Sequence, residues 1–244
     1  SGKKSRRYSV LNGRSMCPRC KHELSAADLF PLLSWLWLKS KCRYCHEPIS
    51  VQYPLVEAIT ALVFVASYIL WPLTLTGAAA LAIFGLWLVL VIILIALAVY
   101  DLKWQLLPNK LVALLGIVAI IQAVVAIASA GDPLNSLINH AIAAAIGGGL
   151  FLLIILLNDK WIGGGDVKLG FVIGLIAVTP AKSGLMLFLA ALAGTLVSLP
   201  LLMNKKLRLK SAVPFGPFLI LATVLVVLFG QDIVNWYFNL IKLG

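Results

Sequence analysis

The stretch Trp161–Leu169 reads WIGGGDVKL, and it sets three consecutive glycines and a carboxylate between two long apolar runs. Each glycine costs about 1 kcal/mol relative to alanine inside a helix, so the stretch predicts a break or bend. A charged carboxylate at the centre of a bilayer costs about 3 kcal/mol. A second acid, Asp101, follows another apolar run in Tyr100–Asn109, which reads YDLKWQLLPN. We interpret Asp101 and Asp166 as a pair that the rest of the chain is arranged to bring together.

The composition is that of a membrane protein. Of the 244 residues, 61% are hydrophobic and 12% are charged, and the mean hydropathy is +1.02. Soluble chains carry about 25% charged residues. The net charge of +11 is compatible with nucleic acid binding, but basic loops beside membrane helices explain it more simply. We therefore expect an all-α polytopic membrane protein whose surroundings are the lipid bilayer and which binds no nucleic acid.

Apolar segments near the length of about 20 residues that spans hydrocarbon follow a polar start. We divide the chain into a basic module, residues 1–53, and a transmembrane domain, residues 54–244. The seven expected spans are residues 55–72, 77–99, 110–130, 137–157, 167–180, 182–203 and 213–230. The fifth, with about 14 residues, reaches only about 21 Å of the roughly 30 Å core. We expect this helix to start inside a polar cleft, with the three glycines as irregular backbone leading into it.

The orientation follows from the distribution of basic residues. Of the 20 Lys and Arg residues, 18 fall on one side of the predicted spans, and ten of these lie in residues 1–53. Because positively charged loops stay in the cytoplasm, the module, Asp101, Asp166 and the 203–212 loop are predicted to face the cytoplasm. Residues 231–243 are predicted to form an interfacial tail.

Two neighbouring carboxyl groups cannot both ionise easily, so such a pair shares one proton. One member can then act as a base that activates water, while the other acts as an acid toward a scissile amide. The sequence contains neither an HExxH nor a GxSxG motif. The simpler alternative for Asp166 is an N-cap of a helix that begins at Val167. For Asp101 that alternative is weaker, because a helix C-terminus disfavours an anion.

The four cysteines form two CxxC pairs, Cys17 with Cys20 and Cys42 with Cys45, separated by 21 residues. This spacing is typical of a four-thiolate zinc site, which would be structural because its coordination is closed. Two disulfides or free thiols are the alternatives, and the reducing compartment predicted by the charge count argues against disulfides.

These segments together resemble the type IV prepilin peptidases, the bacterial GxGD aspartic proteases. Asp101 with Pro108-Asn109, and Gly163–Lys168, resemble the two aspartate motifs of that family. Both CxxC segments are similar to its cytoplasmic loop, and Val213–Phe218 resembles a motif near its C-terminus. Members normally begin with another membrane helix before the cysteine loop, so the resemblance implies eight spans and a longer natural chain.

The resemblance implies that Asp101 and Asp166 are catalytic, without saying which is base and which is acid. It also implies cleavage of the short basic leader of prepilins or pseudopilins at the cytoplasmic face of the inner membrane. Many family members methylate the new N-terminus with S-adenosylmethionine, and no sequence motif locates that site here. The residues expected to line the substrate cleft are Gly163, Gly164, Gly165, Lys168, Pro108, Asn109, Pro214 and Gly216.

Two other functions fit some of the same features. An intramembrane aspartate beside a broken helix is also typical of a proton-coupled transporter, although no inverted repeat supports that function. A related GxGD protease that cuts archaeal preflagellins is the other alternative, and the four-cysteine module favours the prepilin branch.

Overall fold

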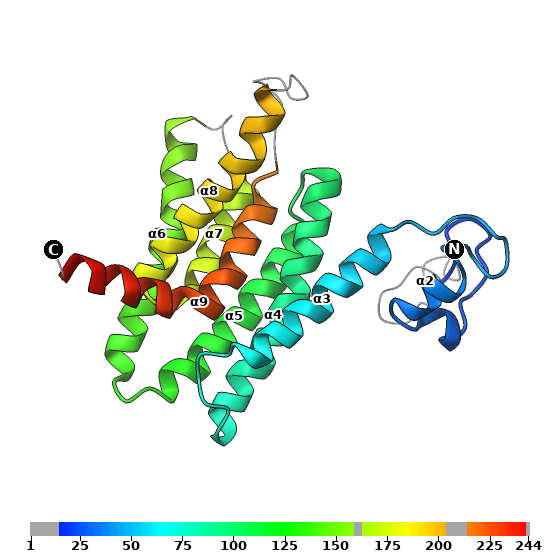
Figure 1. Cartoon of the computed structure of the whole chain (residues 1–244). Helices are drawn as coiled ribbons and strands as arrows, with labels where there is room; N and C mark the ends of the chain where they lie inside the picture. Colours follow the sequence, from blue (N-terminus) through cyan, green and yellow to red (C-terminus); the bar gives the residue numbers. More distant parts are fainter. Residues whose placement is uncertain (1–14, 159–162, 204–213, 243–244) are drawn as a thin grey trace, which may run out of the picture. The chain divides into compact units, whose positions relative to one another are not determined.

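The computed structural model describes residues 15–158, 163–203 and 214–242, which are helical apart from connecting segments and two isolated β-bridges. Residues 1–14, Trp161, Ile162 and most of the 203–212 loop, on which parts of the sequence interpretation rest, lie outside these ranges. The chain divides into two compact units, Ser1–Leu62 and Val63–Gly244 (Figure 1).

The helices follow the apolar segments of the sequence. In chain order they are η1 (Ala26–Leu29), α2 (Leu33–Trp37), α3 (Gln52–Ile69), α4 (Gly77–Trp104), α5 (Asn109–Ala128), α6 (Pro133–Leu157), α7 (Gly164–Ala177), α8 (Pro180–Met203) and α9 (Gly216–Lys242). Within the described ranges, six of these are long and apolar enough to cross a membrane, and α7, with 14 residues, is not. The expected all-α membrane fold with one short helix is confirmed.

Helix α7 occupies the middle of the second unit, where it contacts α5, α6, α8 and α9 (Figure 1). Half of its 14 residues are buried, and Leu169 and Ile173 have no exposed surface. Its short length is tolerated because protein rather than lipid covers most of its surface.

Small residues let α6 and α7 approach closely. A Cβ atom added to Gly147 would lie 2.5 Å from the Gly170 carbonyl oxygen, and one added to Gly174 would lie 2.5 Å from the Ala143 carbonyl oxygen. Backbone therefore packs directly on backbone, as small-residue motifs allow between membrane helices. The triple glycine at 147–149 thus serves helix packing, although a Cβ at Gly149 would meet nothing within 4 Å.

We expect Gly147→Ala to destabilise the protein and Gly149→Ala, its control two residues away, to leave stability unchanged or raise it slightly. Overpacking against rigid backbone costs about 1–3 kcal/mol, whereas alanine gains about 0.5–1 kcal/mol over glycine in an unobstructed helix. Thermal unfolding in detergent, followed by tryptophan fluorescence, measures both. Equal unfolding temperatures for the two variants would contradict the close α6–α7 contact.

The end of the chain differs from the expected boundary at residue 230. Helix α9 extends from Gly216 to Lys242, so the residues of the predicted tail are helical and follow the last span without an intervening loop. In Figure 1 its final part (red) runs across the direction of its first part (orange). Trp236 and Tyr237 in this part are 63% and 54% exposed, as aromatic residues at a membrane interface are.

Candidate functional site

Asp101 lies in the last turn of α4, and only 5% of its surface is exposed. A carboxylate at a helix C-terminus faces the negative end of the helix dipole. Here Asp101 Oδ2 accepts a hydrogen bond of 3.1 Å from the backbone N–H of Gly216, the first residue of α9. The N-terminus of α9 therefore supplies the favourable partial charge that the end of α4 lacks.

Asp166 lies in the first turn of α7, where a helix dipole favours an anion. The helix begins at Gly164 and Gly163 is its N-cap residue, so the structure does not support the alternative in which Asp166 caps a helix that begins at Val167. The expectation of three irregular glycines is wrong, since Gly164 and Gly165 are helical. Glycine has a low helix propensity, but it can adopt helical backbone angles where packing favours them.

Gly165 has a packing role at this helix start. A Cβ atom added there would lie 3.1 Å from Leu107 Cβ, in the connection between α4 and α5. A Cβ atom at this position would require Leu107 to move by a few tenths of an ångström. The glycine thus lets the two aspartate-bearing helix ends adjoin.

The structure brings the two predicted aspartates together. Although they are 65 positions apart, the carboxyl groups of Asp101 and Asp166 are close enough to interact electrostatically. Lys168 Nζ donates a hydrogen bond of 2.9 Å to Asn109 Oδ1 and so joins the second turn of α7 to the start of α5. Four helix ends therefore meet at one end of the bundle.

The remaining predicted cleft residues lie beside these helix ends. Pro108 is the N-cap residue of α5, with φ −64°. Pro214 lies two residues before the start of α9. A Cβ at Gly164 would meet nothing within 4 Å, whereas one at Gly216 would lie 2.5 Å from Asp101 Oδ2. Only glycine can therefore stand at position 216 with the Asp101 carboxyl where it is.

The four cysteines converge in the first unit. Their Sγ atoms all lie within 4.8 Å of one another, and all four thiols are free. Cys17 Sγ and Cys45 Sγ are 3.9 Å apart, close to the roughly 3.8 Å edge of a tetrahedron with zinc–sulfur bonds of about 2.3 Å. The geometry fits a tetrahedral metal ion and excludes the disulfide alternative for this structure.

The two CxxC segments fold as a structural repeat that the sequence interpretation did not identify. The N–H of Cys17 donates to the His22 carbonyl, and the N–H of Cys42 donates to the Glu47 carbonyl. An antiparallel bridge closes each segment, Met16 with Glu23 and Lys41 with Pro48. The fifth residue of each takes a positive φ, 58° at Lys21 and 56° at His46. The sequence signal for this repeat is the constant offset of 25 positions between the two CxxC pairs.

The thiols of Cys17 and Cys45 have shifted pKa values of opposite direction. A hydrogen bond from the Cys20 backbone N–H is the main cause that lowers the pKa of Cys17 to about 7. At Cys45, a backbone hydrogen bond from Glu47 is outweighed by burial and by the three neighbouring thiols, which raise its pKa to about 11. A bound cation would offset the repulsion between neighbouring thiolates.

A buried carboxyl group ties the rest of the module to the second CxxC segment. Asp28, in η1, accepts hydrogen bonds from Arg43 Nε at 2.7 Å and from the Tyr44 hydroxyl at 3.0 Å. Burial raises the pKa of Asp28, but its hydrogen bonds, those from Ser25 included, outweigh this and lower it below its usual value. The carboxylate form is therefore the one that holds η1 in place.

A helical membrane protein with two adjoining carboxyl groups at helix ends fits the class of membrane-embedded aspartic peptidases. The comparisons with known proteins identify the family within that class. Residues 3–71 match the Bacterial Peptidase A24 N-terminal domain, and residues 88–199 match the Type IV leader peptidase family. The chain belongs to the type IV leader peptidase family.

Several curated relatives carry the name prepilin leader peptidase/N-methyltransferase. The chain is 35% identical to that of Aeromonas salmonicida (strain A449), over 96% of this chain and 78% of the relative. It is 30% identical to that of Bacillus subtilis (strain 168), over 95% of this chain and 88% of the relative. It is 32% identical to that of Legionella pneumophila, over 92% and 75%. No solved structure matches the chain.

Proposed function

We propose that this protein cleaves the leader peptide of type IV prepilins or pseudopilins, with Asp101 and Asp166 as the catalytic pair. The supporting observation is that the helix ends carrying these residues adjoin, with Gly165 at the start of α7 against Leu107 in the segment that follows α4, which puts the two carboxyl groups within electrostatic range of each other. One carboxylate takes a proton from water as it attacks the scissile carbonyl, and the other carboxyl group protonates the departing amide nitrogen. Either aspartate can take either role.

The family membership favours this function over the two alternatives. It replaces the interpretation as a proton-coupled transporter, which rested on intramembrane acids alone. The match of residues 3–71 to the bacterial N-terminal domain favours prepilins over archaeal preflagellins as substrates.

We further propose that the catalytic pair and the four-cysteine module face the cytoplasm, in the bacterial inner membrane. The distribution of 18 of the 20 basic residues supports this orientation. The resemblance to the family implies a basic leader that is cleaved at the cytoplasmic face. The proposed orientation would place the catalytic pair on that same side of the membrane.

The metal proposed for the module is Zn²⁺, held by Cys17, Cys20, Cys42 and Cys45. Four thiolates complete a tetrahedral shell, so zinc supplies stability here and leaves no open position for substrate. His22 does not belong to the cluster of possible ligands, and its ring instead stacks on Tyr44 with centroids 3.7 Å apart.

The relatives' names carry a second activity, N-methyltransferase. We propose that this protein also methylates the N-terminus released by cleavage, with S-adenosylmethionine as the methyl donor. Mass spectrometry of a prepilin co-expressed with this protein tests both activities. The expected N-terminal peptide lacks the leader and carries one added methyl group. Unprocessed prepilin beside normally expressed, folded protein would refute the proposal.

Gly216→Ala is expected to lower the rate of leader cleavage by about 10²-fold, because displacing a catalytic group by about 1 Å has such an effect. The added methyl group would lie 2.5 Å from Asp101 Oδ2, so the carboxyl group must move. Gly184→Ala in α8, where nothing lies within 4 Å of the new Cβ, is the control. Cleavage of purified prepilin in detergent measures both variants. A Gly216→Ala rate equal to that of the control would show that the contact does not position Asp101.

A further inference from the structure

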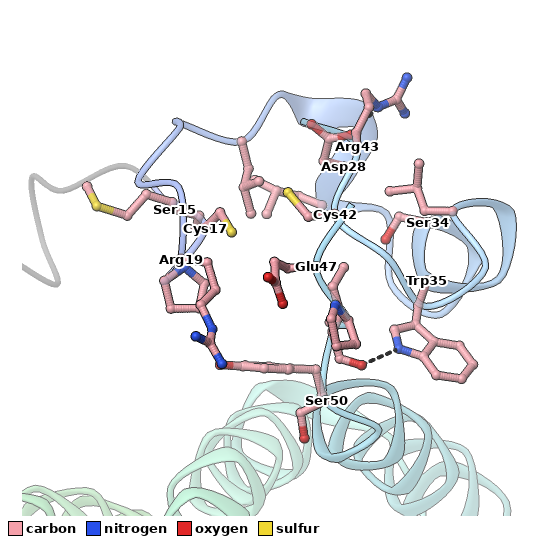
Figure 2. A pocket seen from close by; sticks show the side chains of 18 of the residues that line it. Ser15, Cys17, Arg19, Asp28, Ser34, Trp35, Cys42, Arg43, Glu47 and Ser50 are labelled. Carbon is pink, nitrogen blue, oxygen red and sulfur yellow. Dashed lines mark hydrogen bonds and ion pairs between the residues drawn. The ribbon is translucent and has the colours of Figure 1, made fainter. Parts of the chain in front are cut away.

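The first unit contains a cavity of about 560 Å³ that the proposed peptidase chemistry does not use (Figure 2). This volume lies within the range of about 300–1,000 Å³ typical of small-molecule sites. Its walls come from both CxxC segments, from α2 and from the start of α3, all within residues 15–57. The cavity therefore belongs wholly to the first unit.

Three of the charged side chains that line it, Asp28, Arg43 and Glu57, already have a partner. Asp28 binds Arg43, and Glu57 Oε2 accepts a hydrogen bond of 2.8 Å from the Leu32 backbone N–H. These contacts build the wall of the cavity, so they do not offer a ligand free partners.

Glu47 and Arg19 are different. Both line the cavity, and Figure 2 shows the Glu47 carboxylate and the Arg19 side chain reaching into the same space. Among the residues that the structure describes, neither side chain has a hydrogen bond or ion pair. A carboxylate and a guanidinium thus face one cavity without neutralising each other. This pattern suits a ligand that carries both an ammonium and a carboxylate group.

Aromatic rings complete the lining. The Trp35 indole is fixed by a hydrogen bond of 3.3 Å from its Nε1 to the Ile49 carbonyl, which Figure 2 draws as a dashed line. Tyr53, near the start of α3, is the second aromatic residue in the wall. Aromatic faces stack on nucleobases and attract cations, a sulfonium included.

We propose that this cavity binds S-adenosylmethionine, with Arg19 taking its carboxylate, Glu47 its ammonium group, and Trp35 with Tyr53 its adenine or sulfonium. The inference rests on the proposed N-methylation, because it names the site of the methyl donor. In that reaction the N-terminal amine forms a bond to the methyl carbon, the carbon–sulfur bond breaks with its electrons going to sulfur, and the amine loses a proton. The products are the methylated N-terminus and S-adenosylhomocysteine.

A basic leader peptide is a competing occupant, since Glu47 could attract it. Arg19 argues against that occupant, because its guanidinium would repel the basic side chains of a leader bound at Glu47. A ligand with both charges uses both side chains. The experiment therefore includes prepilin binding and cleavage as separate readouts.

Binding of S-adenosylhomocysteine to the full-length chain in detergent, measured by calorimetry, tests the site directly. Glu47→Gln and Arg19→Gln are each expected to weaken binding by about 10- to 100-fold, the loss that follows removal of a charged hydrogen bond. Lys39→Gln, in the same unit but outside the cavity lining, is the matched control. Zinc content verifies that each variant keeps the module folded. Methylation should fall in both variants, while leader cleavage persists.

Photo-cross-linking of the wild-type protein with an azido-adenine analogue of S-adenosylmethionine identifies the peptides that contact the ligand, without any substitution. The labelled peptides should come from residues 15–57. Labelling confined to Val63–Gly244 would overturn the site. The site would also be overturned if the wild-type protein methylates and both Glu47→Gln and Arg19→Gln bind S-adenosylhomocysteine as tightly as the wild type does. Loss of prepilin cleavage with unchanged S-adenosylhomocysteine affinity would assign the cavity to the leader. A wild-type protein that cleaves but neither binds S-adenosylhomocysteine nor methylates would refute the proposed methylation and this site with it.

Discussion

Asp101→Asn and Asp166→Asn are each expected to lower the rate of leader cleavage by about 10²- to 10⁴-fold, the effect of losing one general acid or base. Asparagine keeps the shape of aspartate and an oxygen that can accept the Gly216 N–H bond at position 101. It can neither take a proton from water nor share one with its partner. The loss is therefore chemical, and the helix ends stay in place.

Asp232→Asn is the control, because Asp232 is an exposed acid of α9 outside the proposed catalytic pair. Cleavage of prepilin by each variant in proteoliposomes, with protein amount and unfolding temperature matched, gives the comparison. The double variant should be no slower than either single variant, since the two groups act as one unit. Substantial cleavage by either single variant would remove the aspartate pair from the mechanism.

Removal of zinc is expected to unfold the four-cysteine module. In the described part of Ser1–Leu62, the buried hydrophobic residues are Cys17 and Cys42, so the cluster itself takes the place of a hydrophobic core. Zinc binding contributes about 10–16 kcal/mol in comparable small modules. A unit of this size without metal or core cannot offset the conformational entropy of folding.

Limited proteolysis with and without a strong chelator measures this effect. The expected cuts appear within residues 15–50 after chelation, and Zn²⁺ added back before the protease prevents them in the wild type but not in Cys42→Ser. Ser34→Ala, in the same unit, should behave as the wild type does. A module that stays resistant without metal would show that the cysteines do not hold the fold through zinc. Helices α4 to α9 should keep their helical content throughout, because their own side chains bury one another.

The sequence interpretation was most accurate where the physics is local. Span length, the short α7 and the clustering of the four cysteines follow from transfer free energies and ligand spacing, which neighbouring residues fix. It was less accurate at helix ends. The start of α7 at Gly164 and the extent of α9 depend on what each terminus packs against, which the sequence does not display. The repeat of the two CxxC segments appears in the sequence only as a 25-residue offset between the cysteines, because the rest of it lies in backbone hydrogen bonds and φ angles.

The amino-acid sequence by itself determined that this chain is a helical membrane protein with a four-cysteine module and two conspicuous acids. The length of an apolar segment, its charge and the spacing of its cysteines are properties of short stretches of chain, so they can be predicted from the sequence alone. Only the tertiary structure decided that the N-terminus of α9 meets Asp101, that a Cβ atom at Gly216 would displace the Asp101 carboxyl group, and that Glu47 and Arg19 share a cavity. The stability of a buried charge depends on dipoles and charges contributed by distant parts of the chain, and the fold alone brings these together.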